Sequence, residues 1–510
     1  MQNTIFYSKI AKNTMMLYFR MLLNMIVSFY TSRIVLDALG IDDFGIYNVV
    51  GGIVVLFTFL NTAMSSATQR FLTFELGKKS GVERLSKVFS TSLNIHVLIS
   101  FFIVILSETI GLYFLNEFMV IPSERMVAAN VVYQCSILSC IMGIMTLPFN
   151  AIIVSYEYMD VFAWISIFDV ILKLVIAYLL YITFFDKLIV YSVLLFLVTL
   201  ITSIIYVLYC YKKFPECKYR CVRDRSLFKS MCSFAGWNLI GNFAYICFTQ
   251  GLNILLNMFF GPAVNAARGI AVQMQGVIGR FAGSFQIAVN PQITKKYAAN
   301  NMDGMYLLLY KSSKISFFLL FIVSYPIILQ TENILNFWLV DVPNYTVSFF
   351  RIIICISMIE VLANPLNIGA QATGKVKKYQ IMEGGTLLFI LPLSFFMLKI
   401  FHRPEVVFIV HLVIAIIVQY IRVLLLNKMI GLSIKDYFKD VILQIIMVST
   451  ASVVLIYVMC VIASSLMDNF FVCTIMSVVI IGVLIFAIGL TNQEKFFIIE
   501  FIRKVSKYKK

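Results

Sequence analysis

The sequence predicts an all-α polytopic membrane protein, and three observations lead to this class. Of its 510 residues, 61% are hydrophobic and 13% charged, and the mean hydropathy is +0.92. A soluble protein would have an apolar share of roughly 45–50%. The apolar residues form long continuous runs of the length that a membrane helix needs, not the short alternating strands of a barrel. Most Lys and Arg lie in short loops between these runs.

Counting the runs predicts about fourteen transmembrane helices, with boundaries good to a few residues. They are expected near 14–38, 44–69, 88–116, 126–154, 160–183, 188–211, 231–259, 263–290, 311–337, 345–371, 376–400, 405–428, 438–467 and 470–490. The predicted organisation is a six-helix lobe (1–211), a cytoplasmic linker (212–230), a second six-helix lobe (231–430), two further helices (431–490) and a basic cytoplasmic tail (491–510).

The distribution of basic residues predicts the orientation. With both termini in the cytoplasm, about 30 of the 41 Lys and Arg fall in the N-terminus, the cytoplasmic loops and the tail. The opposite loops hold about four, namely Arg125, Lys187, Lys399 and Arg403. The formal charge of +16 is therefore explained by membrane topology, and no nucleic-acid partner is expected. One loop, Tyr156 to Asp160, should be cytoplasmic and yet has no basic residue.

Cysteine and histidine usage predicts neither a metal site nor another cofactor. The ten Cys contain no CxxC pair and mostly lie in apolar runs, as small core residues do. The three His have no metal-ligand spacing. The N-terminus carries Lys9 and Lys12 ahead of a long span and no small-residue cleavage site, so we expect a retained first helix and not a signal peptide.

Two correspondences indicate an internal repeat of six helices. Pro148-Phe149-Asn150 matches Pro365-Leu366-Asn367, and Gly40 matches Gly261, at offsets of 217 and 221 residues. Chance matches are the alternative, but two offsets that agree with the helix count favour a repeat. Six is an even number, so the halves share one orientation, and a cleft between them would suit alternating access.

Polar side chains recur at helical spacing in the first two helices of each half. In the span near 263–290, Arg268, Gln275 and Gln286 fall within about 20° of one another, and Arg280 lies about 120° away. The span near 231–259 carries Asn238, Asn242, Tyr245, Thr249 and Asn253, and the first span carries Arg20 and Asn24. Lipid offers such groups no hydrogen bonds, so they face protein or water. Interhelical hydrogen bonding explains any one of them, whereas continuous stripes favour a hydrated cavity.

Seven cations lie inside apolar stretches, where each costs roughly 2.5–3.5 kcal/mol on insertion scales. Arg351 and Arg422 lie near span ends and are interpreted as side chains that extend to the membrane interface. Arg33 can pair with Asp37 one turn later, with a ligand role equally open.

The remaining four cations are candidate ligand residues. Lys173 follows Asp169 by four residues, so a structural ion pair and a ligand site are equally expected. Arg20, Arg268 and Arg280 have no acid one turn away and are the better candidates for a ligand. The candidate substrate-binding residues are thus Arg20, Asn24, Lys173, Asn242, Thr249, Asn253, Arg268, Gln275, Arg280 and Gln286, and those for ion coupling are Glu360 and Asp169.

Several short motifs carry a resemblance to a known family. They are Leu36-x-x-x-Gly40, Asp43-Phe44-Gly45-Ile46-Tyr47, Ala67-x-x-Arg70-Phe71, Pro148-Phe149-Asn150 and Asn290-Pro291-Gln292. With these motifs, the segment between Asn13 and Gly81 resembles the start of bacterial polysaccharide-export flippases, which belong to the multidrug/oligosaccharidyl-lipid/polysaccharide (MOP) superfamily. The similarity extends over essentially the whole chain. It implies two six-helix lobes plus two C-terminal helices.

The resemblance further implies a bacterial inner-membrane transporter that moves undecaprenyl-pyrophosphate-linked oligosaccharide to the outer leaflet for O-antigen or capsule synthesis. Lipid and other membrane proteins of polysaccharide assembly are the expected partners. The alternative in the same superfamily is a drug or cation antiporter, for which mid-span acids are few. A membrane polymerase or ligase would need a sizeable outer loop, and nucleotide-driven transport would need a GxxxxGK[ST] loop, which is absent from the sequence. No enzymatic activity is expected.

Overall fold

The protein is a multi-pass, all-α membrane protein, as the sequence predicts. A computed structural model describes residues 2–55, 58–117, 121–220, 224–338, 342–462, 470–491 and 494–495. In these ranges the chain forms helices and no strand, and 12 helices are long and apolar enough to cross a membrane. The chain divides into two compact units, here called the N-terminal unit (Asn13–Leu239) and the C-terminal unit (Ile240–Lys510 with Met1–Lys12).

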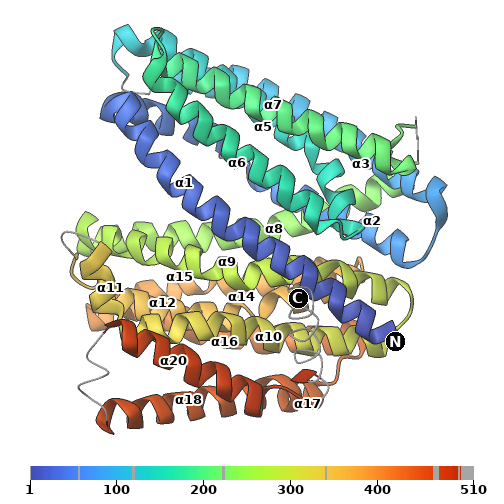
Figure 1. Cartoon of the computed structure of the whole chain (residues 1–510), viewed down its shortest axis with the longest axis vertical. Helices are drawn as coiled ribbons and strands as arrows, with labels where there is room; N and C mark the ends of the chain where they lie inside the picture. Colours follow the sequence, from blue (N-terminus) through green and yellow to red (C-terminus); the bar gives the residue numbers. More distant parts are fainter. Residues whose placement is uncertain are drawn as a thin grey trace, which may run out of the picture. The chain divides into compact units, whose positions relative to one another are not determined.

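The N-terminal unit is built from long helices that pack along their sides. Its elements are α1 (Gln2–Val55, which begins in the other unit), α2 (Thr58–Gly77), α3 (Gly81–Leu106) with a π-helical end (Ser107–Gly111), α4 (Leu112–Glu117), α5 (Met126–Ser155), α6 (Met159–Ile182), α7 (Lys187–Lys213) and the first part of α8 (Arg225–Phe260). Figure 1 shows α5, α6 and α7 side by side, in agreement with their mutual contacts. The unit boundary lies inside α8, beyond the linker predicted at 212–230.

The C-terminal unit contains the rest of α8, several long helices, and shorter helices that are made by breaks within a span. They are α9 (Pro262–Ala298), α10 (Met302–Leu329), α11 (Thr331–Trp338), α12 (Thr346–Glu360), α13 (Ala363–Ala372), α14 (Lys377–Leu388), α15 (Ile390–Phe401), α16 (Glu405–Ile430), α17 (Ile434–Tyr437), α18 (Leu443–Ile462) and α20 (Phe470–Leu484). A predicted span near 311–337 in fact begins at Met302, because the helix continues beyond its apolar run.

Both glycines of the proposed repeat break a helix in the same way. Gly40 has φ 79° and ψ 170°, and Gly261 has φ 81° and ψ −175°. Only glycine adopts this region without strain, because it has no Cβ. The matching conformation is what equivalent positions in a repeat require, although the lobe boundaries themselves stay a prediction.

The corner at the first of these glycines is held by charged groups from two other segments, Arg125 before α5 and Asp186 with Lys187 at the start of α7. Arg125 Nε donates to Asp43 Oδ1 at 2.9 Å, and its Nη1 donates to Asp186 Oδ2 at 2.5 Å. Lys187 Nζ donates at 3.2 Å to the carbonyl of Ala38, which the break deprives of its helical partner. Asp43, part of the motif that carries the family resemblance, therefore has a structural role at this corner.

The loop from Tyr156 to Asp160, which has no basic residue, forms hydrogen bonds with other segments of the unit. Tyr156 donates from its hydroxyl to Glu216 Oε1 at 2.5 Å, and its ring stacks on Phe214 with 4.8 Å between centroids. The carbonyl of Glu157 accepts a hydrogen bond from Asn13. The loop is therefore packed against its own unit through these contacts.

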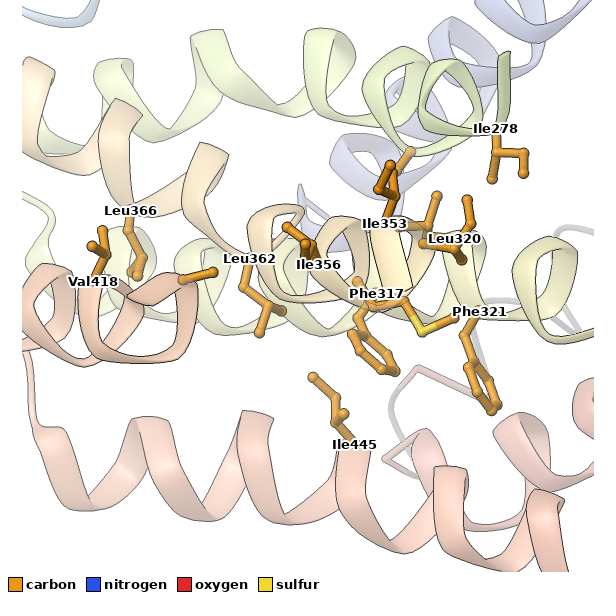
Figure 2. Close-up of a cluster of buried hydrophobic side chains, with 14 of the residues drawn as sticks. Ile278, Phe317, Leu320, Phe321, Ile353, Ile356, Leu362, Leu366, Val418 and Ile445 are labelled. Atoms are coloured by element: carbon orange, nitrogen blue, oxygen red, sulfur yellow. The ribbon is translucent and has the colours of Figure 1, made fainter. Parts of the chain in front are cut away.

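The core of the C-terminal unit includes the two last helices. Figure 2 shows Phe317 and Phe321 of α10 beside Ile353 and Ile356 of α12, with Ile445 reaching toward them from α18. Burial of such side chains is favourable by roughly 1.5–3 kcal/mol each in water, but between membrane helices the gain comes mainly from close packing. The two C-terminal helices are therefore an integral part of this unit.

Candidate functional site

The polar stripe on α9 is directed at helices of its own unit. Arg268 is 6% exposed, and its Nη2 donates to the carbonyl of Thr249 on α8 at 3.1 Å. Its Nη1 donates to Asn253 Oδ1, and Asn253 in turn donates to Gln250 at 2.9 Å. Of the three guanidinium nitrogens of Arg268, Nε alone has no partner among the described atoms. Arg268 thus joins α9 to α8.

The two glutamines of the stripe bridge α9 to the α12–α13 span. Gln275 Nε2 donates to Ser357 Oγ at 2.7 Å, and Gln286 Nε2 donates to the carbonyl of Val361 at 2.9 Å. Val361 lies at the break between α12 and α13, four residues before Pro365, whose ring nitrogen has no hydrogen to donate to that carbonyl. Gln286 therefore satisfies the group that the proline leaves free. Interhelical hydrogen bonding, the alternative to a hydrated cavity, accounts for this stripe.

Arg280 lies on a different face of α9 and is exposed. It is at the middle of the helix, and the described part of the chain provides no hydrogen-bond or ion-pair partner for it. A cation such as Arg280, without a partner at the middle of a span, requires water or a ligand.

On α8, Asn242 is half-buried, and the hydroxyl of Thr249 donates to the carbonyl of Tyr245 at 2.7 Å.

In the N-terminal unit, α1 and α6 meet through polar side chains. The guanidinium of Arg20 lies over the ring of Phe162 at 4.4 Å from its centroid, and Asn24 Nδ2 donates to Ser166 Oγ at 2.8 Å. Arg20 Nε and Asn24 Oδ1 have no partner among the described atoms. Sequence reasoning missed Phe162 and Ser166. They follow the same helical face as Asp169, a periodicity that could have indicated them.

Lys173 and Asp169 form the ion pair that their spacing suggested. Nζ lies 2.7 Å from Oδ2, and the side chains are 41% and 25% exposed. A pair this accessible contributes little to stability, about 0–1 kcal/mol. The pair does offset the charge of both residues, so each is a weaker candidate for binding a ligand by itself. Their role in transport stays a prediction.

Glu360 has a basic neighbour that sequence reasoning did not assign. Its Oε1 lies 3.3 Å from His411 Nε2 on α16, close enough for an ion pair when the imidazole is protonated, although the angle gives no hydrogen bond. His411 also packs edge-on against Phe248 of α8, with 5.1 Å between the ring centroids. Glu360, a candidate for ion coupling, therefore has an imidazole beside its carboxylate.

Arg422 differs most from its prediction as an interface residue. It is 6% exposed, and its Nε and Nη2 donate to Glu383 Oε1 at 2.9 and 2.6 Å. Gln419 accepts from Nη1 at 3.3 Å and donates to Tyr437 at 3.2 Å, which completes a buried network. The prediction used the number of residues between Arg422 and the end of its span. That number does not say which neighbouring helix the side chain contacts, which is α14.

Arg351 and Arg33, the two cations nearest the outer ends of their spans, differ in their contacts. Arg351 donates to the carbonyl of Ile328 at 3.3 Å and approaches Glu332 at 3.5 Å, as expected of a residue at a span end. Arg33 is exposed, and the carboxylate of Asp37 accepts a hydrogen bond from Tyr181 at 2.6 Å. The suggested pairing of Arg33 with Asp37 is not formed. In the described ranges no group of three or more His, Cys, Asp and Glu side chains is placed to hold a metal ion.

Comparison with known proteins identifies the fold. No family model matches the sequence, and no curated protein matches it. Among solved structures, a MATE mutant matches with TM-score 0.71 and 13% identity, covering 83% of this chain and 96% of that one. An outward-facing multidrug resistance MATE family transporter of the MOP superfamily gives the same four values. A MOP superfamily transporter from Pyrococcus furiosus matches with TM-score 0.61 and 12% identity, at 83% and 96% coverage.

The chain therefore has the fold of the MOP-superfamily MATE transporters. At identities this low, the likeness is one of architecture. The activity must be argued from the charges and contacts of this chain itself.

Proposed function

We propose that this protein is a flippase that moves an undecaprenyl-pyrophosphate-linked oligosaccharide across the bacterial inner membrane by alternating access, for surface polysaccharide synthesis. The observation that carries the proposal is the pairing of charges within the spans. Asp169, Glu360 and Glu383 each lie beside a base. Arg20 and Arg280 have no acidic partner in the described ranges. The unbalanced charge is positive, as an anionic substrate requires.

A pyrophosphate head group suits cations of this kind. Guanidinium groups bind phosphate oxygens with two parallel hydrogen bonds, and they do so most strongly away from bulk water. Arg280 is the best placed, because it is exposed and unpaired at mid-helix. Arg20 is next, since its ring contact with Phe162 orients the guanidinium and leaves Nε free. Arg268 is already bonded to Asn253 and Thr249 and would contribute charge only, whereas the charge of Lys173 is offset by Asp169.

The alternative function is a drug or cation antiporter of the same fold. One of the matched structures is described as a multidrug resistance transporter, which favours this alternative. Another, from Pyrococcus furiosus, is described as having a binding pocket of reverse polarity, so pocket charge differs between proteins of this architecture. A cationic substrate calls for free acids, and the three mid-span acids here have basic neighbours. We infer no enzymatic activity.

Ion coupling would fall to Glu360 in this proposal. His411 Nε2 lies 3.3 Å from its carboxylate, which gives the pair two groups that can carry a proton. Anion export from a negative-inside cell is already downhill by roughly 2.3 kcal/mol per charge per 100 mV. Coupling would therefore assist transport rather than supply all of its energy.

The test is complementation of surface polysaccharide in the bacterium from which this gene has been deleted. We expect Arg280→Ala to abolish polymer export and Arg280→Lys to retain part of it. Arg351→Ala is the control, because it removes the same charge at a span end. Membrane levels of each variant are measured by immunoblot. Normal polymer from Arg280→Ala at wild-type levels would refute the assignment, and a deletion that alters drug tolerance alone would favour the antiporter.

A further inference from the structure

A short segment between α7 and α8 runs back along α3 of the N-terminal unit. It is called here the α3 strap and consists of Lys218, Tyr219 and Arg220. The carbonyl of Lys218 accepts a hydrogen bond from Ser86 Oγ at 3.2 Å. The backbone N–H of Arg220 donates to Ser90 Oγ at 3.0 Å, and the hydroxyl of Tyr219 donates to Asn94 Oδ1 at 3.1 Å. The strap is therefore fixed to a helix of its own unit.

The three partners on α3 place the strap at the boundary of the membrane. Ser86, Ser90 and Asn94 follow one another at four-residue steps, so they lie on one face of the helix. The first and the last are about 12 Å apart along the helix axis. The apolar run of this span begins near residue 88, so the strap reaches from the polar end of α3 to its first turns within the bilayer. Tyr219, with an apolar ring and a polar hydroxyl, is typical of that depth.

Three acids in the segments next to the strap are already paired with other bases. Glu83 Oε1 lies 2.8 Å from Lys87 Nζ. Asp224 Oδ2 lies 3.5 Å from Arg84 Nη1, and Glu75 Oε1 lies 3.4 Å from Arg84 Nε. These carboxylates are therefore not free to neutralise the strap.

The two cations of the strap have no ion-pair partner in the described part of the chain. Both Lys218 and Arg220 are exposed. Glu83 is within electrostatic range of Arg220, but its ion-pair partner is Lys87. Long basic side chains beside hydrocarbon extend to the level of the lipid phosphates, and an anionic membrane surface attracts them. A negatively charged head group would supply the counter-charge that the protein does not.

We propose that the α3 strap binds the head group of an anionic phospholipid, in the leaflet that the charge distribution predicts to be cytoplasmic. The guanidinium of Arg220 donates to the phosphate oxygens, and the ammonium of Lys218 adds a second positive charge. The hydrogen bonds to α3 hold the backbone between these two residues, so both cations are presented at head-group depth. Binding of this lipid is separate from transport, so the inference does not depend on the flippase function.

The experiment measures lipid binding by the full-length protein in detergent. Phosphatidylglycerol and phosphatidylcholine are added in equal amounts, and the bound lipids are counted by native mass spectrometry. We expect the wild-type protein to prefer phosphatidylglycerol. Lys218→Gln combined with Arg220→Gln should weaken that binding by roughly fivefold for each charge removed. The backbone groups of these residues make the bonds to Ser86 and Ser90, so the variant keeps the strap in place.

Lys212→Gln combined with Lys213→Gln is the matched control, because it removes the same charge at the end of α7, outside the strap. We expect the control variant to retain the wild-type preference. Equal losses in the two double variants would show that overall charge attracts the lipid, and the assignment to the strap would be wrong. A wild-type protein that binds both lipids equally would also overturn the proposal.

A further variant changes the geometry of the strap and leaves its charge unaltered. Ser86→Ala combined with Ser90→Ala removes two of the hydrogen bonds that hold the strap to α3. Phosphatidylglycerol binding should fall, although both cations are still present. Size-exclusion chromatography checks that the variant stays monodisperse. Wild-type binding by a monodisperse variant would contradict the positioning of the site by α3.

Discussion

Removal of Arg422 should destabilise the C-terminal unit more than removal of any exposed cation. The Arg422 and Glu383 side chains are 7% and 10% exposed, and two guanidinium nitrogens contact one carboxylate oxygen. Arg422→Met leaves the Glu383 carboxylate buried without a counter-charge, which typically costs about 3–5 kcal/mol. Replacing both partners, as in Arg422→Met with Glu383→Leu, removes that penalty and should return stability to within about 1 kcal/mol of wild type.

The assay is thermal inactivation in detergent, followed as the fraction of protein that stays monodisperse in size-exclusion chromatography after heating. A chain of this size does not unfold in two states, so midpoints are compared as apparent values. Arg351→Met is the control, because its pair with Glu332 is 43% and 67% exposed and should be worth about 0–1 kcal/mol. The reasoning is refuted if Arg422→Met is as mild as the control, or if the double variant is as unstable as Arg422→Met.

Two further predictions concern helix irregularities, and both are read by the same heating assay. Gly111→Ala places a Cβ 2.0 Å from the hydroxyl of Tyr133, which donates to a carbonyl of the π-helical turn, and the clash should cost about 1–3 kcal/mol. Gly143→Ala, where a Cβ meets nothing within 4 Å, should be neutral or stabilising, and equal behaviour of the two variants would contradict this account. Gln286→Leu leaves the carbonyl of Val361 without its partner and should cost about 1–3 kcal/mol, an expectation that wild-type heat resistance of this variant would overturn.

The spans could be predicted from the sequence because the bilayer imposes a length and a composition on every helix. Each predicted span overlaps a helix in the described ranges. The ends were less predictable, as the early start of α10 at Met302 illustrates, because a helix continues into polar sequence when its neighbours support it. The breaks at Gly40 and Gly261 were foreseen only as matching positions. Their shared backbone conformation depends on φ and ψ, which the sequence limits but does not determine.

The sequence predicted which residue types form the candidate site, but not which neighbouring helix each side chain contacts. Periodicity placed Arg268, Gln275 and Gln286 on one line, and the structure keeps that line. What periodicity lacks is the identity of the neighbouring helix, so it could not tell that these residues bond to α8 and α12. Arg280, which the same arithmetic separated from them by about 120°, is the residue left exposed.

The pairing of charges supports an anionic substrate more strongly than their number does. A count of cations in the spans includes Lys173 and Arg422, which the structure joins to Asp169 and Glu383. Such pairs are neutral to an approaching ligand and attract neither sign. Four guanidinium groups then remain without an acid, those of Arg20, Arg33, Arg268 and Arg280. Arg268 is bonded to neutral groups of α8, Arg20 lies against an aromatic ring, and Arg280 is exposed on α9. A drug cation would be repelled by these groups, whereas a pyrophosphate would be attracted, so the residual charge argues for the proposed flippase over the antiporter.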